Sequence, residues 1–182
     1  MQEILHSFKK RKVKGGFVAV KLDLQKAYDR VNWSFLIKVL QKFGFYPCFI
    51  GWISECISTF SFSILVNGSI TKHFRPSRGL RQGDPLSPYL FILDQEVLSR
   101  LIDREFMLGS IKGVKMNVAG LAFTHVMYAD DIMIFAKANC NEISVLDNCL
   151  ETYCELGVAL GKGEVGDCPR PYLKIRPHPK KF

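Results

Sequence analysis

The stretch His125–Ala136, with the sequence HVMYADDIMIFA, decides how this chain folds. Two apolar runs flank the adjacent pair Asp130-Asp131, and no acidic or basic residue interrupts Val126–Tyr128 or Ile132–Phe135. Runs rich in β-branched and aromatic residues on both sides of a tight connection predict two antiparallel strands. We therefore expect a β-hairpin whose turn, Ala129-Asp130-Asp131, carries two carboxylates beyond the edge of the strands.

Adjacent carboxylates at the mouth of an apolar hairpin repel each other and resist the loss of water. A divalent cation relieves both effects, and hard oxygen ligands of this kind suit Mg²⁺. Taken alone, however, an Asp-Asp pair is more often an ordinary acidic turn than a metal site. The rest of the sequence has to decide between these two interpretations.

Strands and helices alternate around this hairpin in the predicted secondary structure. Phe17–Asp23 (FVAVKLD) is typical of a mostly buried strand, and it ends in a carboxylate. The other predicted elements each carry a local signal at one end. They are a helix from Trp33 to Phe43 capped by Asn32, a helix opened by Pro47, a hairpin over Phe60–Phe74 turning at Asn67-Gly68, a helix from Pro85 and Pro88 to about Arg104, and a helix from about Glu142 to Leu156 capped by Asn139 or Asn141.

The chain has 182 residues, of which 48% are hydrophobic and 23% charged, so one globular domain is expected. Its formal net charge of +8 lies at the two ends, because residues 1–14 and 162–182 are strongly basic. Basic ends can meet phosphate, but on charge alone a solvated tail is the better interpretation. Residues 162–182 also contain four of the eight prolines. We expect residues 1–156 to form the domain and residues 157–182 to be a disordered tail.

Six cysteines show neither a C-x-x-C pair nor a zinc-ligand spacing, which favours reduced core thiols in an intracellular protein, nuclear or cytoplasmic. No apolar run approaches the roughly 20 residues that a membrane span needs, so we expect no membrane partner. Nothing in the sequence indicates the oligomeric state.

A basic, glycine-containing loop, Arg78–Pro88, leads into one of the predicted helices. Arg78 and Arg81 supply cations that pair with phosphate, and a helix N-terminus adds to an anion cradle. If the strand ending at Asp23 lies beside the Asp130-Asp131 hairpin, three carboxylates meet in one cluster. Such a cluster suits two Mg²⁺ ions and an in-line phosphoryl displacement.

Three segments resemble the palm motifs of reverse transcriptases: Phe17–Val31 (FVAVKLDLQKAYDRV), Arg78–Leu93 (RGLRQGDPLSPYLFIL) and Tyr128–Asp131 (YADD). They occur in the family's order and spacing, and the resemblance as a whole covers roughly residues 1–155. The sequence is most similar to the non-LTR, LINE-type retrotransposon enzymes of plants. The resemblance implies that the Asp-Asp pair is a metal site and not an ordinary acidic turn.

The resemblance implies that Asp23, Asp130 and Asp131 are the catalytic carboxylates and the ligands of two Mg²⁺ ions, which Mn²⁺ can replace. Asp23 and Asp130 are then the principal ligands. Tyr28 matches the aromatic ring that excludes a 2′-hydroxyl on the incoming sugar, although without the motif a core aromatic would be the better interpretation.

In the same way, Gln82 and Gly83 match the loop that packs on the nascent base pair and template, with Arg81 beside them as a substrate-binding cation. The implied fold is α+β, an antiparallel palm sheet with helices on one face, incomplete fingers and no thumb. The implied activity is RNA-directed DNA polymerisation from dNTPs onto a DNA primer along an RNA template. We expect this truncated chain alone to be inactive.

Two other functions stay open at this point. The chain could be a catalytically inactive retroelement remnant that at most binds nucleic acid weakly. It could also be another palm-type nucleotidyltransferase, either an RNA-directed RNA polymerase or a nucleotide cyclase. Tyr28 argues against an RNA product, and the Gln82-Gly83 loop argues against a cyclase.

Overall fold

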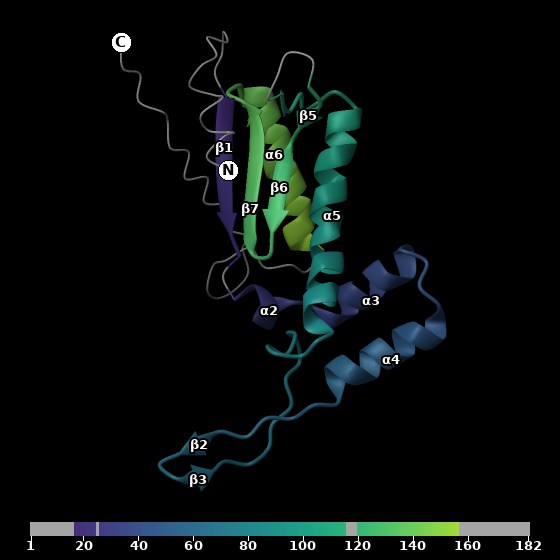
Figure 1. Ribbon diagram of the computed structural model, residues 1–182, viewed down its shortest axis with the longest axis vertical. Helices are drawn as coiled ribbons and strands as arrows, with labels where there is room; N and C mark the ends of the chain where they lie inside the picture. The colour runs from purple at the N-terminus through teal and green to yellow at the C-terminus, as the bar shows by residue number, and fades with distance from the viewer. Residues whose placement is uncertain (1–16, 25, 116–119, 157–182) are drawn as a thin grey trace. The chain divides into compact units, whose positions relative to one another are not determined.

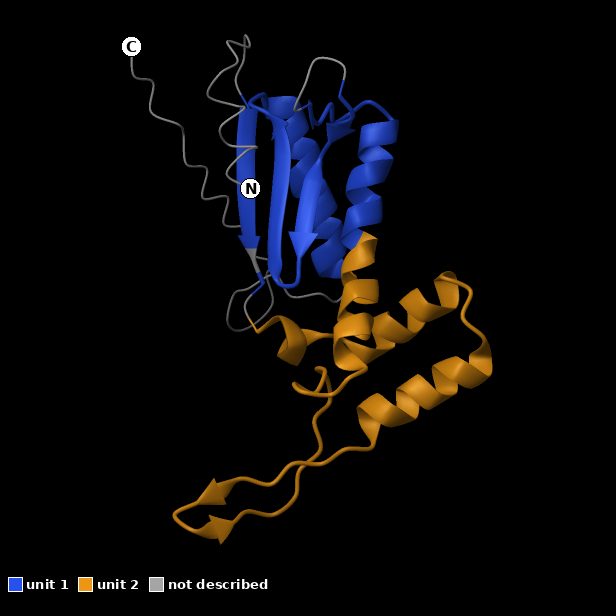
Figure 2. Ribbon diagram, viewed as in Figure 1, with its two compact units in different colours: residues 1–25, 98–155, 160–182 blue, residues 26–97, 156–159 orange. Residues whose placement is uncertain are grey.

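A computed structural model of the chain describes residues 17–24, 26–115 and 120–156 (Figure 1). The tail expected over residues 157–182 lies outside this part. The described residues combine helices with antiparallel strands, which confirms the predicted α+β class. The chain divides into two compact units, residues 1–25 with 98–155 and 160–182, and residues 26–97 with 156–159 (Figure 2).

The first unit is built on a three-stranded antiparallel sheet in the order β1-β7-β6. Its strands are β1 (Phe17–Asp23), β6 (His125–Tyr128) and β7 (Asp131–Lys137), as the sequence predicts. Strand β7 lies in the centre, and its residues 132–136 are all buried. A continuous apolar run suits this position because a central strand is covered on both faces.

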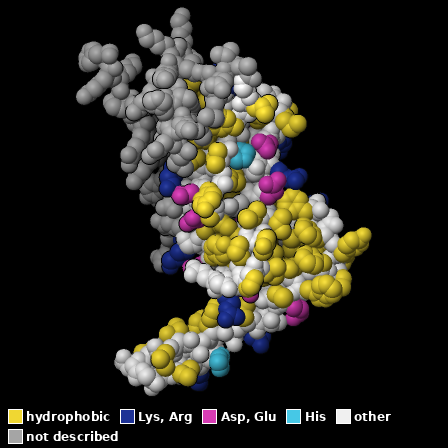
Figure 3. Space-filling model, in the orientation of Figure 1, with side chains coloured by type: hydrophobic (Ala, Val, Ile, Leu, Met, Phe, Trp, Pro, Cys, Tyr) yellow, Lys and Arg dark blue, Asp and Glu magenta, His cyan; other side chains and the backbone are white. Residues whose placement is uncertain are grey.

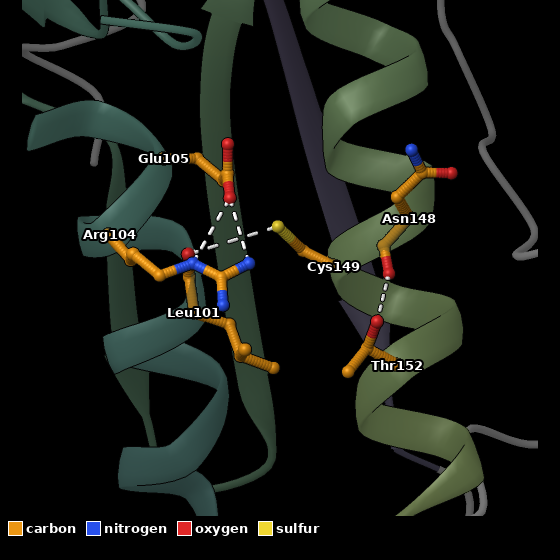
Figure 4. Close-up of polar contacts among 6 residues, drawn as sticks. All are labelled: Leu101, Arg104, Glu105, Asn148, Cys149 and Thr152. Atoms are coloured by element: carbon orange, nitrogen blue, oxygen red, sulfur yellow. Dashed lines mark hydrogen bonds and ion pairs between the residues drawn. The ribbon is translucent and has the colours of Figure 1, made fainter. Parts of the chain in front are cut away.

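Two helices cover one face of this sheet, α5 (Ser87–Met107) and α6 (Cys140–Glu155) (Figure 1). The Ser99 hydroxyl on α5 lies 2.8 Å from His125 Nε2 on β6, so α5 is held against the sheet. Helix α6 contacts β7 and begins as predicted, since the Glu142 backbone N–H donates to Asn139 Oδ1 (2.8 Å). The two helices also touch each other, where the Cys149 thiol points at the Leu101 carbonyl, 3.9 Å away (Figure 4).

The prediction of core thiols is wrong for most of the described cysteines. All five are free, but only Cys149 is buried, and three of them (Cys48, Cys56 and Cys140) are exposed. Burial raises the pKa of the Cys149 thiol, the nearby Glu105 charge acts in the same direction, and Arg104 opposes both. Arg104 is itself paired with Glu105 at 2.9 Å (Figure 4). Cys149 therefore stays a protonated packing group between the two helices.

Among the described residues, a small hairpin packs on one end of the opposite face of the sheet. There, β4 (Val114–Lys115) and β5 (Ala122–Phe123) pair with each other, and Val114 packs with Met133 and Phe135 of β7. The Phe123 ring meets the Phe135 ring edge-on at 5.3 Å. Since Phe135 pairs with Ala19 near the start of β1, this small hairpin covers the end of the sheet remote from Asp131.

The second unit consists of short helices followed by an exposed hairpin. Asn32 caps α3 as predicted, since its Oδ1 accepts the Phe35 backbone N–H at 3.2 Å. Asn67 (φ 49°) and Gly68 (φ 81°) form the predicted hairpin turn, in which both central residues need a positive φ. The elements are α2 (Ala27–Arg30), α3 (Trp33–Lys42), α4 (Pro47–Ser58), β2 (Leu65–Val66), β3 (Ser69–Ile70) and the first part of α5, up to residue 97. No helix in the described part of the chain is long and apolar enough to cross a membrane.

Candidate active site

The acidic hairpin tip forms at the predicted place. Tyr128 and Asp131 are the last residue pair of β6 and β7, so Ala129 and Asp130 make a two-residue turn between them. Ala129 has a φ of 51°, a left-handed conformation that costs roughly 1–2 kcal/mol for a residue with a Cβ. Asp130 is exposed and Asp131 is half-buried as the first residue of β7. The tight turn thus presents one carboxylate at the tip and one at the strand end.

Asp23 is the direct partner of Asp131 in the pairing of β1 with β7. Directly opposed residues in an antiparallel pair have Cα atoms about 4.5–5.5 Å apart. The sheet therefore brings the three predicted acidic residues to one end of one unit, although Asp23 and Asp131 are far apart in sequence. This register confirms that the strand and the hairpin are neighbours.

A residue that the sequence interpretation missed, Lys21, also belongs to this end of the sheet. Its Nζ lies 2.5 Å from Asp131 Oδ1, and the two side chains are 58% and 47% exposed. Lys21 pairs with Met133, two residues beyond Asp131, so the ion pair runs diagonally between neighbouring strands. The sequence does carry a signal for Lys21, because it lies two residues before Asp23 and alternate residues of a strand share one face. An exposed pair of this kind contributes at most about 1 kcal/mol.

The acidic residues at this end of the sheet are of the type that binds a divalent cation. Exposed carboxylate oxygens are the donors that Mg²⁺ prefers. The Asp131 carboxylate forms an ion pair with the Lys21 ammonium, so it already binds one cationic group. Among the side chains that the structure describes, no three acidic, histidine or cysteine groups gather to hold a metal, and the Asp23 side chain is not among those described. Asp23 is therefore placed at this end of the sheet by its backbone pairing with Asp131.

The predicted substrate-binding residues come together in the second unit. The Leu80 backbone N–H donates to the Tyr28 carbonyl and the Gly79 N–H to the Val31 carbonyl, both at 2.8 Å. These two bonds hold the basic loop along residues 28–31. Arg81, Gln82 and Gly83 follow directly, and all three are exposed. The structure thus places Tyr28 and the loop as one group, while the acidic residues form a second group in the other unit.

Tyr28 combines features of a core aromatic and of a ligand contact. Its ring stacks on Phe91 of α5 with centroids 4.8 Å apart and an interplanar angle of 21°. Phe91 is only 3% exposed, whereas Tyr28 is half-buried. One face of the Tyr28 ring is therefore fixed by the core, and part of the residue remains accessible.

Gly79 is required where the loop meets α2. It has a φ of 91°, its carbonyl accepts the Trp33 indole N–H at 2.6 Å, and an added Cβ would lie 2.9 Å from the Asp29 carbonyl oxygen.

We expect Gly79→Ala to lower the free energy of unfolding of the second unit by roughly 1–3 kcal/mol, because backbone strain and a clash with the Asp29 carbonyl oxygen add to each other. Chemical denaturation followed by tryptophan fluorescence measures the change, because Trp33 and Trp52 both lie in the second unit. Gly44→Ala, also at positive φ (81°) but with open space around the added Cβ, is the control for strain alone. An equal loss in both variants would contradict a role for the close approach.

Comparisons with known proteins place the chain in one family and show what it is similar to. Residues 2–162 match the family described as Reverse transcriptase (RNA-dependent DNA polymerase). The Pol polyprotein of the Drosophila melanogaster retrotransposable element R2DM is 30% identical over 140 residues, which are 76% of this chain and 12% of that protein. An Arabidopsis thaliana mitochondrial protein, AtMg01250, is 48% identical over 67 residues, 37% of this chain and 55% of that protein. Apo telomerase from Candida tropicalis, truncated from its C-terminal domain, has a similar fold, with a TM-score of 0.56, 17% identity and coverage of 82% of this chain and 30% of that one.

Proposed function

Because the chain belongs to the reverse transcriptase (RNA-dependent DNA polymerase) family, we propose that it carries the palm of an RNA-directed DNA polymerase. The observation that supports this most strongly is the pairing of Asp23 with Asp131, next to the exposed Asp130 in the adjoining turn. The chain spans only 12% of the Drosophila polyprotein it matches, so the activity proposed is that of the whole protein to which this domain would contribute.

In this proposal Asp23, Asp130 and Asp131 are the catalytic carboxylates and hold two Mg²⁺ ions, which Mn²⁺ can replace. When bound, such ions lower the pKa of the attacking primer hydroxyl and stabilise the leaving pyrophosphate. Asp130 contributes an exposed carboxylate from a strained turn whose conformation is already set before a ligand arrives. The Lys21 ammonium neutralises Asp131, so repulsion between the acidic residues is lowered in the absence of metal.

The second group of residues is proposed to bind the substrate. Arg81 offers an exposed guanidinium for the triphosphate, which it can pair in a bidentate manner. Gln82 and Gly83 contact the nascent base pair, where the absence of a Cβ at Gly83 allows close approach. Tyr28, held by Phe91, excludes a 2′-hydroxyl from the sugar position.

The partners we propose are an RNA template, a DNA primer and dNTPs. We also propose that the protein comes from a non-LTR element of a plant and acts inside the cell, in the nucleus or cytoplasm. The similarity to the Drosophila retrotransposable element supports an origin in a retrotransposon, and the similarity to an Arabidopsis protein supports a plant source. Primer extension on an RNA template with dNTPs and Mg²⁺, with and without a chelator, tests the proposed activity. Metal binding without extension by the complete protein would favour an inactive remnant instead.

Tyr28→Ala is expected to relax the choice of sugar. Removing the ring removes a steric clash with the 2′-hydroxyl, so incorporation of ribonucleotides relative to deoxyribonucleotides should rise by roughly tenfold or more. Single-nucleotide incorporation with matched dNTP and rNTP pairs measures the ratio in a polyprotein that contains this domain. Tyr28→Phe, which keeps the ring, and Tyr46→Ala, which removes an exposed tyrosine on another part of the unit, are the controls. An unchanged ratio in Tyr28→Ala would leave Tyr28 as a core aromatic.

A further inference from the structure

The second unit carries an exposed hairpin, residues 60–75, which we call the hairpin arm. We propose that the hairpin arm binds a single strand of RNA, with base stacking on Phe62 and Phe74 and phosphate contacts to Lys72 and Arg75. The inference rests on the proposed function, which supplies an RNA template as the ligand, and it assigns that strand a binding surface apart from the acidic residues.

The hairpin arm lies in a segment that has basic residues but no acidic ones. Residues 56–83 contain no aspartate or glutamate, but they contain four Lys and Arg residues that are all exposed: Lys72, Arg75, Arg78 and Arg81. This stands out because acidic and basic residues are equal in number over residues 15–161 as a whole. A continuous positive segment without acids matches a phosphate backbone, which an acidic side chain would repel. Figure 3 shows basic side chains and a histidine beside hydrophobic ones along the arm.

Aromatic rings run from the core of the unit out along the arm. Trp33 is half-buried and meets Phe60 at 6.2 Å, Phe60 meets Phe62 at 5.2 Å, and Phe62 meets Phe74 at 5.9 Å. The last two rings are 40% and 47% exposed. Stacking on exposed aromatic rings beside cations is how proteins hold single strands without reading their sequence. Bases within a duplex are already stacked on each other, so this surface suits a single strand.

The backbone fixes the two exposed rings as a pair. The Phe62 N–H donates to the Phe74 carbonyl at 2.8 Å, and the Phe74 N–H donates to the Phe62 carbonyl at 2.9 Å. Both residues therefore keep their places before a ligand arrives, which lowers the entropy that binding has to overcome. The chain then continues directly into the loop that carries Arg81, so the arm and the predicted substrate loop form one basic segment.

The tip of the arm suggests a different partner, a protein surface, because Leu65 and Ile70 are 67% and 72% exposed. Aliphatic side chains pack well against protein but offer no flat face to a base. The rings and the cations lie together toward the base of the arm, and neither a row of rings nor the absence of acids is needed for a protein contact. The observations therefore favour RNA.

Fluorescence anisotropy with a labelled single-stranded RNA tests the proposal on the full chain, in EDTA and in an Asp130→Asn background. These conditions remove catalysis, so the experiment measures RNA binding alone. A failure of RNA binding can then be distinguished from a failure of polymerase activity. Phe62→Ala/Phe74→Ala is expected to weaken RNA binding by roughly tenfold or more. Phe45→Ala, which removes a partly exposed ring (37%) stacked on Phe49, should leave the affinity unchanged.

The cations are tested separately, because truncating an exposed lysine or arginine does not endanger the fold. Lys72→Ala/Arg75→Ala should reduce the slope of log affinity against log salt by about 1.4, since each phosphate contact to a single strand contributes about 0.7. Lys38→Ala/Lys42→Ala, two exposed lysines on α3, should leave the slope as it is. Wild-type affinity in the double phenylalanine variant, or equal affinity for duplex DNA of the same length, would overturn the proposal and favour a protein partner for the arm.

Discussion

Asp130→Asn is expected to reduce RNA-directed nucleotide addition by at least about 100-fold in a polyprotein that carries this domain. The amide keeps the size of the side chain but loses the charge that a divalent cation requires. Asp130 is exposed in a two-residue turn, so the substitution should leave the packing of the sheet intact. Primer extension on an RNA template with Mg²⁺ measures the rate.

The matched control for this variant is Asp103→Asn. Asp103 is an exposed carboxylate on helix α5. It has no role in the proposed site. It should extend the primer at the wild-type rate. Equal rates for the two variants would mean that the turn is an acidic loop with no part in catalysis.

Phe135→Ala is expected to lower the free energy of unfolding of the first unit by about 3–5 kcal/mol. Phe135 is 1% exposed in the central strand and packs against Val114, Met133 and the Phe123 ring. Removing the ring leaves a cavity that the paired strands cannot close, because β7 is held by β1 on one side and β6 on the other. A loss of this size is a large share of the stability of an ordinary domain.

Urea denaturation followed by circular dichroism measures this loss, and the two units should be fitted as separate transitions if they unfold separately. Phe74→Ala, which removes a ring that is 47% exposed, should cost less than about 1 kcal/mol. Similar losses in the two variants would show that the Phe135 ring is not part of a close-packed core.

The local elements of this fold are predictable because local rules act on them. Asn32 caps a helix with its own side chain, and Asn67-Gly68 supplies the two positive φ values that a short hairpin turn requires. The apolar runs around Asp130-Asp131 likewise specify their strands by composition. In each case the deciding interaction lies within a few residues.

The contacts of the candidate site are less predictable because they join distant segments. The stacking of Tyr28 on Phe91, the approach of Gly79 to Asp29 and the exposure of three cysteines all depend on which faces pack together. Helical spacing alone does not show which side of a helix is covered. The pairing of Asp23 with Asp131 was expected only as one possible neighbour relation, until the resemblance to palm motifs favoured it.

Titration of the chain with Mn²⁺, followed by electron paramagnetic resonance, tests the proposed metal site most directly because it needs neither template nor primer. A site at the end of the sheet predicts that Asp130→Asn lowers the Mn²⁺ affinity by at least about tenfold, while Asp103→Asn binds as the wild type does. Equal Mn²⁺ affinity in the two variants would contradict a metal site at Asp130.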